Sequence, residues 1–167
     1  MDNEALLMLM LVVAAVAVVI GIVLMIGGRG YPYSPQPYLF TKAEQVFLPV
    51  LERAAEPYGL RVYGKVRIAD VLKVDLPDGS QRFWRWFRLI SSKHVDYVLV
   101  DPKTYRPIAA LELDDSSHFK RDRKERDTFV NKAFASAGIP LIRVPWQRNY
   151  SVGNVRAILN ECLSEKA

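Results

Sequence analysis

Three acidic residues interrupt two otherwise apolar segments in the middle of the chain. Asp96 lies in the segment 95–100, and Glu112 and Asp114 lie in and just after the segment 108–113. Glu112 and Asp114 are two positions apart, so a strand would place both on one face. Close carboxylates repel unless protons or a divalent cation intervene, and such hard oxygen ligands suit Mg²⁺ or Mn²⁺. The alternative is that one or two of them simply cap strand ends in water.

The spacing of the two segments predicts a β-hairpin that would gather these acids. If residues 101–107 form its loop, Val100 pairs with Ile108 and Asp96 falls opposite Glu112. We therefore expect three carboxylates at one end of a sheet.

Several motifs around the acids resemble those of the PD-(D/E)XK nuclease-like superfamily. Part of the pattern is similar to the branch related to very-short-patch-repair endonucleases. More closely, the combination resembles an uncharacterised bacterial domain family that is often carried behind a membrane helix. The resemblance covers roughly residues 39–143. The motifs that carry it are Asp96, the run Glu-Leu-Asp-Asp-Ser-Ser-His at 112–118, and the segments 39–44, 93–97, 126–127 and 138–143.

The resemblance implies a metal-dependent hydrolase of phosphodiester bonds in DNA or RNA. Asp96 would be the central ligand of Mg²⁺ or Mn²⁺, Glu112 the second, and the carbonyl of Leu113 the third. Glu44 matches the first-helix glutamate of many superfamily members. It also fits the N3 position of a capping box that begins at Thr41.

The pattern departs from the superfamily at Asp114, where a lysine usually stabilises negative charge. A carboxylate cannot do that. His118 resembles a histidine that takes part in the repair-endonuclease-like branch, and it could act as general base or orient a water molecule. The other interpretation of His118 is a capping or surface residue. A catalytically inactive nuclease-fold module that binds nucleic acid or a protein partner is the alternative function, because a fold does not determine an activity.

Two segments combine cations in ways that suit nucleic acid. The first, residues 120–126, could bind phosphates or could be the solvated face of a helix. The second, residues 82–90, mixes aromatic and basic residues as single-strand binders and interfacial membrane helices do. The cations of the first segment are Lys120, Arg121, Arg123, Lys124 and Arg126.

The elements that must position these residues follow from apolar spacing and from turn and cap residues. Their order predicts an α/β fold with a restriction-endonuclease-like mixed sheet flanked by helices. We expect helices over 41–56, 82–90 and 119–137 and a last helix capped by Ser151, with strands over 60–68, 95–100, 108–113 and 141–144.

The N-terminal segment is of a different kind. Residues 5–26 contain no charged or polar side chain, and as a helix they would span about 33 Å, enough to cross a bilayer. Its acidic start and its length argue against a cleaved signal peptide. Arg29 and Lys42 follow the segment and no Lys or Arg precedes it, which predicts the N-terminus outside and the remainder in the cytoplasm of a bacterium, anchored in its inner membrane.

Composition supports this division. The chain has 167 residues, 50% of them hydrophobic, and a formal net charge of +5, which becomes +6 once residues 1–30 with Asp2, Glu4 and Arg29 are set aside. The lone Cys162 cannot form an intramolecular disulfide. We expect an anchor over 1–30, a linker rich in Pro and Tyr over 31–40, and one nuclease-like domain over 41–167.

Overall fold

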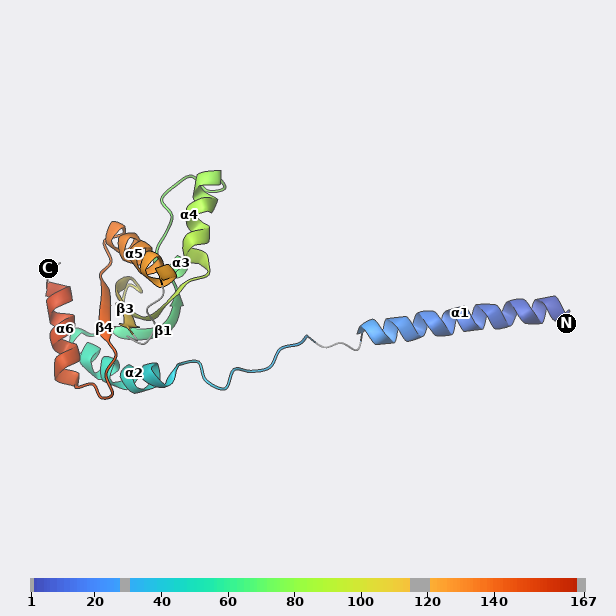
Figure 1. Ribbon diagram of the computed structural model, residues 1–167, viewed down its shortest axis with the longest axis horizontal. Helices are drawn as coiled ribbons and strands as arrows, with labels where there is room; N and C mark the ends of the chain where they lie inside the picture. Colours follow the sequence, from blue (N-terminus) through green and yellow to red (C-terminus); the bar gives the residue numbers. More distant parts are fainter. Residues whose placement is uncertain (1, 28–30, 115–120, 165–167) are drawn as a thin grey trace. The chain divides into compact units, whose positions relative to one another are not determined.

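The computed structural model describes residues 2–27, 31–114 and 121–164, of which residues 26 and 121–127 are described by their backbone alone. The chain divides into two compact units, Met1–Pro37 and Tyr38–Ala167. The first unit contains the helix α1 (Asn3–Gly27) (Figure 1). Its described side chains are exposed along its length. Its portion Asn3–Met25 is long and apolar enough to cross a membrane. The predicted apolar helix is therefore present.

The second unit is a mixed α/β domain in which helices flank a four-stranded sheet. The predicted fold class is confirmed, and the short helices η1 and α3 are additions to it. In chain order the elements are α2 (Lys42–Ala55), η1 (Glu56–Tyr58), β1 (Arg61–Arg67), α3 (Ile68–Val71), α4 (Gln81–Ser91), β2 (His94–Val100), β3 (Pro107–Asp114), α5 (Arg121–Ser136), β4 (Leu141–Pro145) and α6 (Val152–Ser164).

The sheet has the strand order β1-β2-β3-β4. Strand β2 is antiparallel to both β1 and β3, whereas β4 runs parallel to β3 because α5 crosses over between them. The predicted hairpin of β2 and β3 is confirmed, but its register is irregular. Val100 pairs with Pro107 and not with Ile108, because a bulge follows the pair formed by Leu99 and Ala109.

Two apolar layers cover the two faces of the sheet. On one face, Phe47 of α2 and Leu159 of α6 pack with Tyr97 and Leu99 of β2 in the larger buried cluster. Helices α2 and α6 lie side by side over this face (Figure 1). On the other face, α3, α4 and α5 supply a second buried cluster around Val98, with Ile68, Ile90, Val130 and Phe134.

Local capping explains where two of the helices begin. The Thr41 side chain accepts a hydrogen bond from the Glu44 backbone N–H, and the Glu44 side chain accepts one from the Thr41 N–H, which completes the predicted capping box. Ser151 caps α6 by accepting from the Asn154 N–H at 3.1 Å, as expected. These two helices frame the face of the sheet on which Glu44 lies.

Candidate site of paired acidic and basic residues

Asp96 lies where β2 and β3 stop pairing with each other. The last pair between the strands is Tyr97 with Leu111, so Asp96 and Glu112 are the first residues beyond the paired part of each strand. The Asp96 Oδ2 atom accepts a hydrogen bond from the Leu113 backbone N–H at 2.9 Å. The carboxylate thus occupies the place of a strand partner for Leu113 and is held between the two strands.

Lys65 of β1 lies beside this carboxylate, and sequence reasoning did not identify it. Its Nζ atom is 2.7 Å from Glu44 Oε1 and 3.4 Å from Asp96 Oδ1. Lys65 also has a φ angle of +56°, a left-handed conformation that a residue with a side chain adopts at a cost of about 1–2 kcal/mol. Strained residues of this kind persist where the surrounding structure holds them, and they cluster at functional sites.

Glu44 links the site to α2 and has both roles that the sequence left open. Its Oε2 atom accepts from the Thr41 backbone N–H at 3.0 Å, while Oε1 accepts from Lys65. The residue is buried, with 6% of its surface exposed. The hydroxyl of the buried Tyr97 donates to the Glu44 carbonyl oxygen at 2.7 Å and holds this part of α2 against β2. The capping role and the position next to Asp96 therefore coexist.

The electrostatic environment shifts the pKa values of Asp96 and Glu44 in opposite directions. Burial raises the pKa of Asp96, and the nearby charge of Glu44 acts in the same direction against the hydrogen bond from Leu113 and the charge of Lys65. Burial would also raise the pKa of Glu44, but the hydrogen bonds from Lys65 and Thr41 outweigh it and lower that pKa. Burial would lower the pKa of Lys65, but its two acidic partners raise it, so Lys65 stays charged.

Glu112 and Asp114 lie in a second group, together with Arg143 of β4. Parallel pairing sets Glu112 opposite Arg143. The Arg143 Nη1 atom is 3.0 Å from Glu112 Oε2 and 2.7 Å from Asp114 Oδ1, and its Nε atom donates to Asn131 Oδ1 of α5. Arg143 therefore places a positive charge beside Asp114, the position at which the motif lacks its usual lysine.

The expected cluster of three carboxylates is not formed as one group. Among the residues whose side chains the structure describes, no set of three or more His, Cys, Asp or Glu side chains is arranged to hold a metal ion. The physical reason is that Asp96 turns toward Leu113 and Lys65, whereas Glu112 and Asp114 turn toward Arg143. The assignment of Asp96, Glu112 and the Leu113 carbonyl as metal ligands remains a prediction.

Other predicted site residues lie outside the part that the structure describes. His118 and Lys120 belong to the undescribed stretch 115–120. Arg121, Arg123, Lys124 and Arg126 fall in the first two turns of α5, of which only the backbone is described. Their roles in catalysis and in phosphate binding stay predictions.

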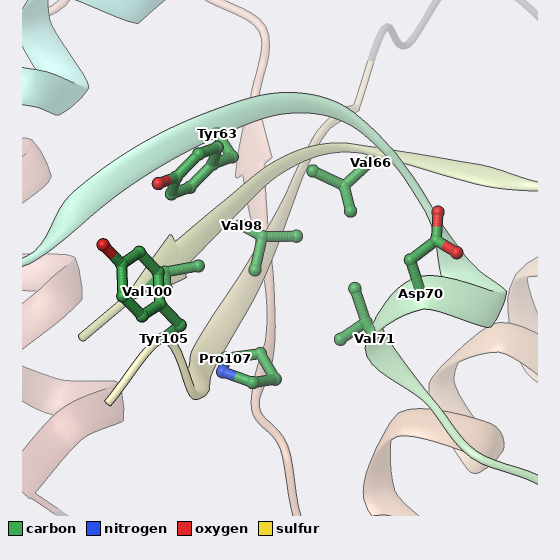
Figure 2. A pocket seen from close by; sticks show the side chains of 8 residues that line it. All are labelled: Tyr63, Val66, Asp70, Val71, Val98, Val100, Tyr105 and Pro107. Carbon is green, nitrogen blue, oxygen red and sulfur yellow. The ribbon is translucent and has the colours of Figure 1, made fainter. Parts of the chain in front are cut away.

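A pocket of about 290 Å³ lies away from these acids, over β1, β2 and the start of β3 (Figure 2). Most of its lining is apolar, and its one carboxylate, Asp70, forms an ion pair with Arg67. None of the predicted site residues lines it. Its lining consists of Tyr63, Val66, Asp70, Val71, Val98, Val100, Tyr105 and Pro107.

These features define an α/β protein with a four-stranded mixed sheet, flanking helices and an N-terminal apolar helix, whose acidic residues are paired with cations at one end of the sheet. The chain belongs to the family described as protein of unknown function DUF2726, whose model matches residues 36–162. No curated protein and no solved structure matches it. The family match agrees with the resemblance to an uncharacterised domain family and leaves the nuclease relationship a prediction.

Proposed function

We propose that this protein is a membrane-anchored, nuclease-like enzyme that hydrolyses phosphodiester bonds of DNA or RNA with Mg²⁺ or Mn²⁺. The observation that carries the proposal is the position of Asp96, a carboxylate of raised pKa held between two separating strands and beside a strained lysine. Perturbed titratable groups and backbone strain cluster at functional sites.

The donor groups fit a hard divalent cation. Mg²⁺ is usually held by one or two carboxylates and completes its shell with water and substrate phosphate oxygens. Asp96 and Glu112, on neighbouring strands, are such a pair, and a set of three acids is not required. When bound, the metal ion would make its water more acidic and neutralise charge that develops on the phosphate.

Lys65 supplies the cation that the motif lacks at Asp114. It reaches Asp96 from β1, so a positive charge is available at the acidic site although the sequence position of the usual lysine holds a carboxylate. A lysine ammonium stabilises phosphate oxygens as a point charge. In this proposal Asp96 and Glu112 bind the metal, Lys65 neutralises the substrate, and His118 orients water or accepts a proton.

The test is cleavage by the full-length chain in detergent, with single-stranded DNA, double-stranded DNA and RNA, each with and without Mg²⁺ or Mn²⁺. Asp96→Asn should abolish metal-dependent cleavage. Asp70→Asn is the matched control, because it removes a carboxylate that is exposed and paired with Arg67 outside the site. Equal cleavage by Asp96→Asn and the unmodified chain would contradict the proposal.

One observation favours a second function, a module that binds nucleic acid or a protein partner without cleaving. The carboxylates of both groups already have cationic partners within the chain, which satisfies them without a metal ion. Calorimetric titration with Mn²⁺ separates the two functions. A catalytic site predicts Mn²⁺ binding that Glu112→Gln weakens, whereas a structural site predicts no binding that depends on Glu112.

The proposed location is the bacterial inner membrane, with α1 as the anchor, the N-terminus outside and the domain in the cytoplasm. The support is the one-sided placement of Arg29 and Lys42 after the apolar segment. Alkaline phosphatase fused to the C-terminus, which is active only outside the cytoplasm, should be inactive. An active fusion would reverse the orientation.

A further inference from the structure

Helix α4 presents an apolar face that the rest of the domain covers only in part. Phe83, Phe87 and Ile90 recur at helical spacing, but of these only Ile90 is buried in the core. Phe83 and Phe87 border a hollow of about 260 Å³ that α3 and the segment 72–78 line on its other side. In Figure 1, α4 extends away from the sheet. Its first two turns therefore keep an aromatic surface on which Phe83 and Phe87 are half-buried.

Two tryptophans stand at the edges of this face. At about 100° per residue, Trp84 and Trp86 fall on opposite borders of the arc centred on Phe83 and Phe87. Trp84 is 47% exposed and Trp86 is 46% exposed. Trp84 also makes edge-on ring contacts with Phe83 and Phe87, so these aromatic rings form one continuous apolar surface.

The opposite side of α4 is mainly basic, with the exposed Leu89 between Arg82 and Arg85, and it carries no acidic residue. Arg82, Arg85 and Arg88 are exposed, and each lies outside the apolar arc. Arg88 follows Trp84 by four residues and Arg82 precedes Trp86 by four, so each tryptophan has an arginine beside it on the helix surface. Phenylalanines therefore occupy the centre of one side of the helix and tryptophans its two borders, and the other side carries the three arginines and Leu89.

We propose that α4 docks in the plane of an anionic lipid surface, with its aromatic face in the headgroup region and its arginines at the lipid phosphates. Interfacial helices require apolar and basic residues on opposite arcs, with tryptophan at the boundary. Single-stranded nucleic acid binds where aromatic side chains that stack on bases and basic side chains that contact phosphates line the same groove. On α4 the aromatic and basic side chains lie on different sides of the helix.

The proposed membrane anchor would keep α4 near a lipid surface. The proposal rests on the proposed membrane anchorage by α1. Residues 28–41, between α1 and α2, can extend over at most about 50 Å, which confines the domain to the neighbourhood of the bilayer. Tethering raises the effective concentration of lipid at α4, so a short helix face suffices for docking.

The experiment uses the full-length chain reconstituted into vesicles that contain lipids brominated on their acyl chains, which quench tryptophan fluorescence on contact. The chain has three tryptophans. Trp146→Phe leaves the pair on α4, and the double variant Trp84→Phe/Trp86→Phe leaves Trp146, which is similarly exposed and serves as the control. Vesicles are made from phosphatidylcholine alone or from phosphatidylcholine with phosphatidylserine.

We expect the α4 tryptophans to lose intensity and shift to the blue in the vesicles with phosphatidylserine, and Trp146 to change much less. Each arginine near an anionic surface favours binding about fivefold, so Arg82→Gln/Arg88→Gln should lower the ratio of docked to undocked α4 roughly 30-fold. Circular dichroism of each variant reports whether the fold is kept.

The outcomes separate this inference from the anchorage on which it rests. If the chain floats with the vesicles but the α4 tryptophans are quenched no more than Trp146, the anchorage stands and the docking of α4 is refuted. If the chain does not float with the vesicles, the anchorage fails and the docking fails with it. If single-stranded oligonucleotide changes the emission of Trp84 and Trp86 while brominated lipid does not, the face binds nucleic acid and the lipid proposal is overturned.

Discussion

The Lys65 ammonium donates to Glu44 Oε1 over 2.7 Å, and it does so from a strand residue whose φ angle is +56°. The pair joins β1 to the first turn of α2, and Asp96 of β2 is its third member. Left-handed backbone at a lysine opposes folding, whereas the two ion pairs favour the conformation that brings the ammonium to the acids. Backbone strain and ion pairing at Lys65 therefore contribute to stability with opposite signs, and substitutions can measure the two separately.

Lys65→Gly should be more stable than Lys65→Ala by about 1 kcal/mol, although both lose the ion pairs, because glycine adopts positive φ without the steric cost. Denaturant unfolding of the two variants measures the difference. The control position is Lys73, an exposed lysine with ordinary φ, where glycine should be the less stable of the two. An alanine variant at Lys65 that equals or exceeds the glycine variant would show that the backbone there is not strained.

Asp96→Asn should gain stability relative to the unmodified protein as the pH rises from below 3.8 through the raised pKa of Asp96. The pKa of Asp96 is raised above its ordinary value of 3.8, so the folded state binds the proton more tightly than the unfolded state and loses stability as the carboxyl ionises. Asparagine stays neutral, and its side-chain oxygen can still accept from the Leu113 N–H. Free energies of unfolding across this pH range give the difference.

The Asp70→Asn variant is the control, because its stability relative to the unmodified protein should change with pH in the opposite direction. Arg67 lowers the pKa of Asp70, so its carboxylate contributes stability above pH 3.8 that is lost as the pH falls through the folded pKa. This variant should lose a little stability at neutral pH and match the unmodified protein in acid. Parallel profiles for the variants at 96 and 70 would contradict the assigned environment of Asp96.

Arg143→Ala should lower the free energy of unfolding by about 1–3 kcal/mol, because it removes the cation between Glu112 and Asp114 and a hydrogen bond to Asn131. Arg143→Lys should be intermediate, since one ammonium cannot reproduce the planar donor geometry. The comparison is Arg67→Ala, which breaks an exposed pair with Asp70 and should cost less than about 1 kcal/mol. Equal losses at the two arginines would indicate that the Arg143 group contributes no more than a surface pair.

Local sequence patterns were sufficient for most of the secondary structure. The helical recurrence of apolar residues located α2, α4, α5 and α6, and the capping residues Thr41 and Ser151 marked where α2 and α6 begin. Two short apolar segments joined by a loop located the hairpin of β2 and β3. The bulge that moved the partner of Val100 to Pro107 was not predictable, because one inserted residue leaves the apolar pattern of either strand unchanged.

The sequence by itself determined the apolar helix, the order of the longer helices and the strands, and the hairpin of β2 and β3, since these depend on residues close together in the chain or joined by one short loop. Only the tertiary structure decided which cations meet those acids. Lys65 reaches Glu44 and Asp96 from a third element, and Arg143 reaches Glu112 through the parallel pairing of β3 with β4. A lysine in a strand that also contains Arg61, Tyr63 and Arg67 carries no signal of its own in the sequence. Its left-handed backbone and its ion pairs exist only once α2, β1 and β2 pack together, because nonlocal contacts supply the free energy that holds such a conformation.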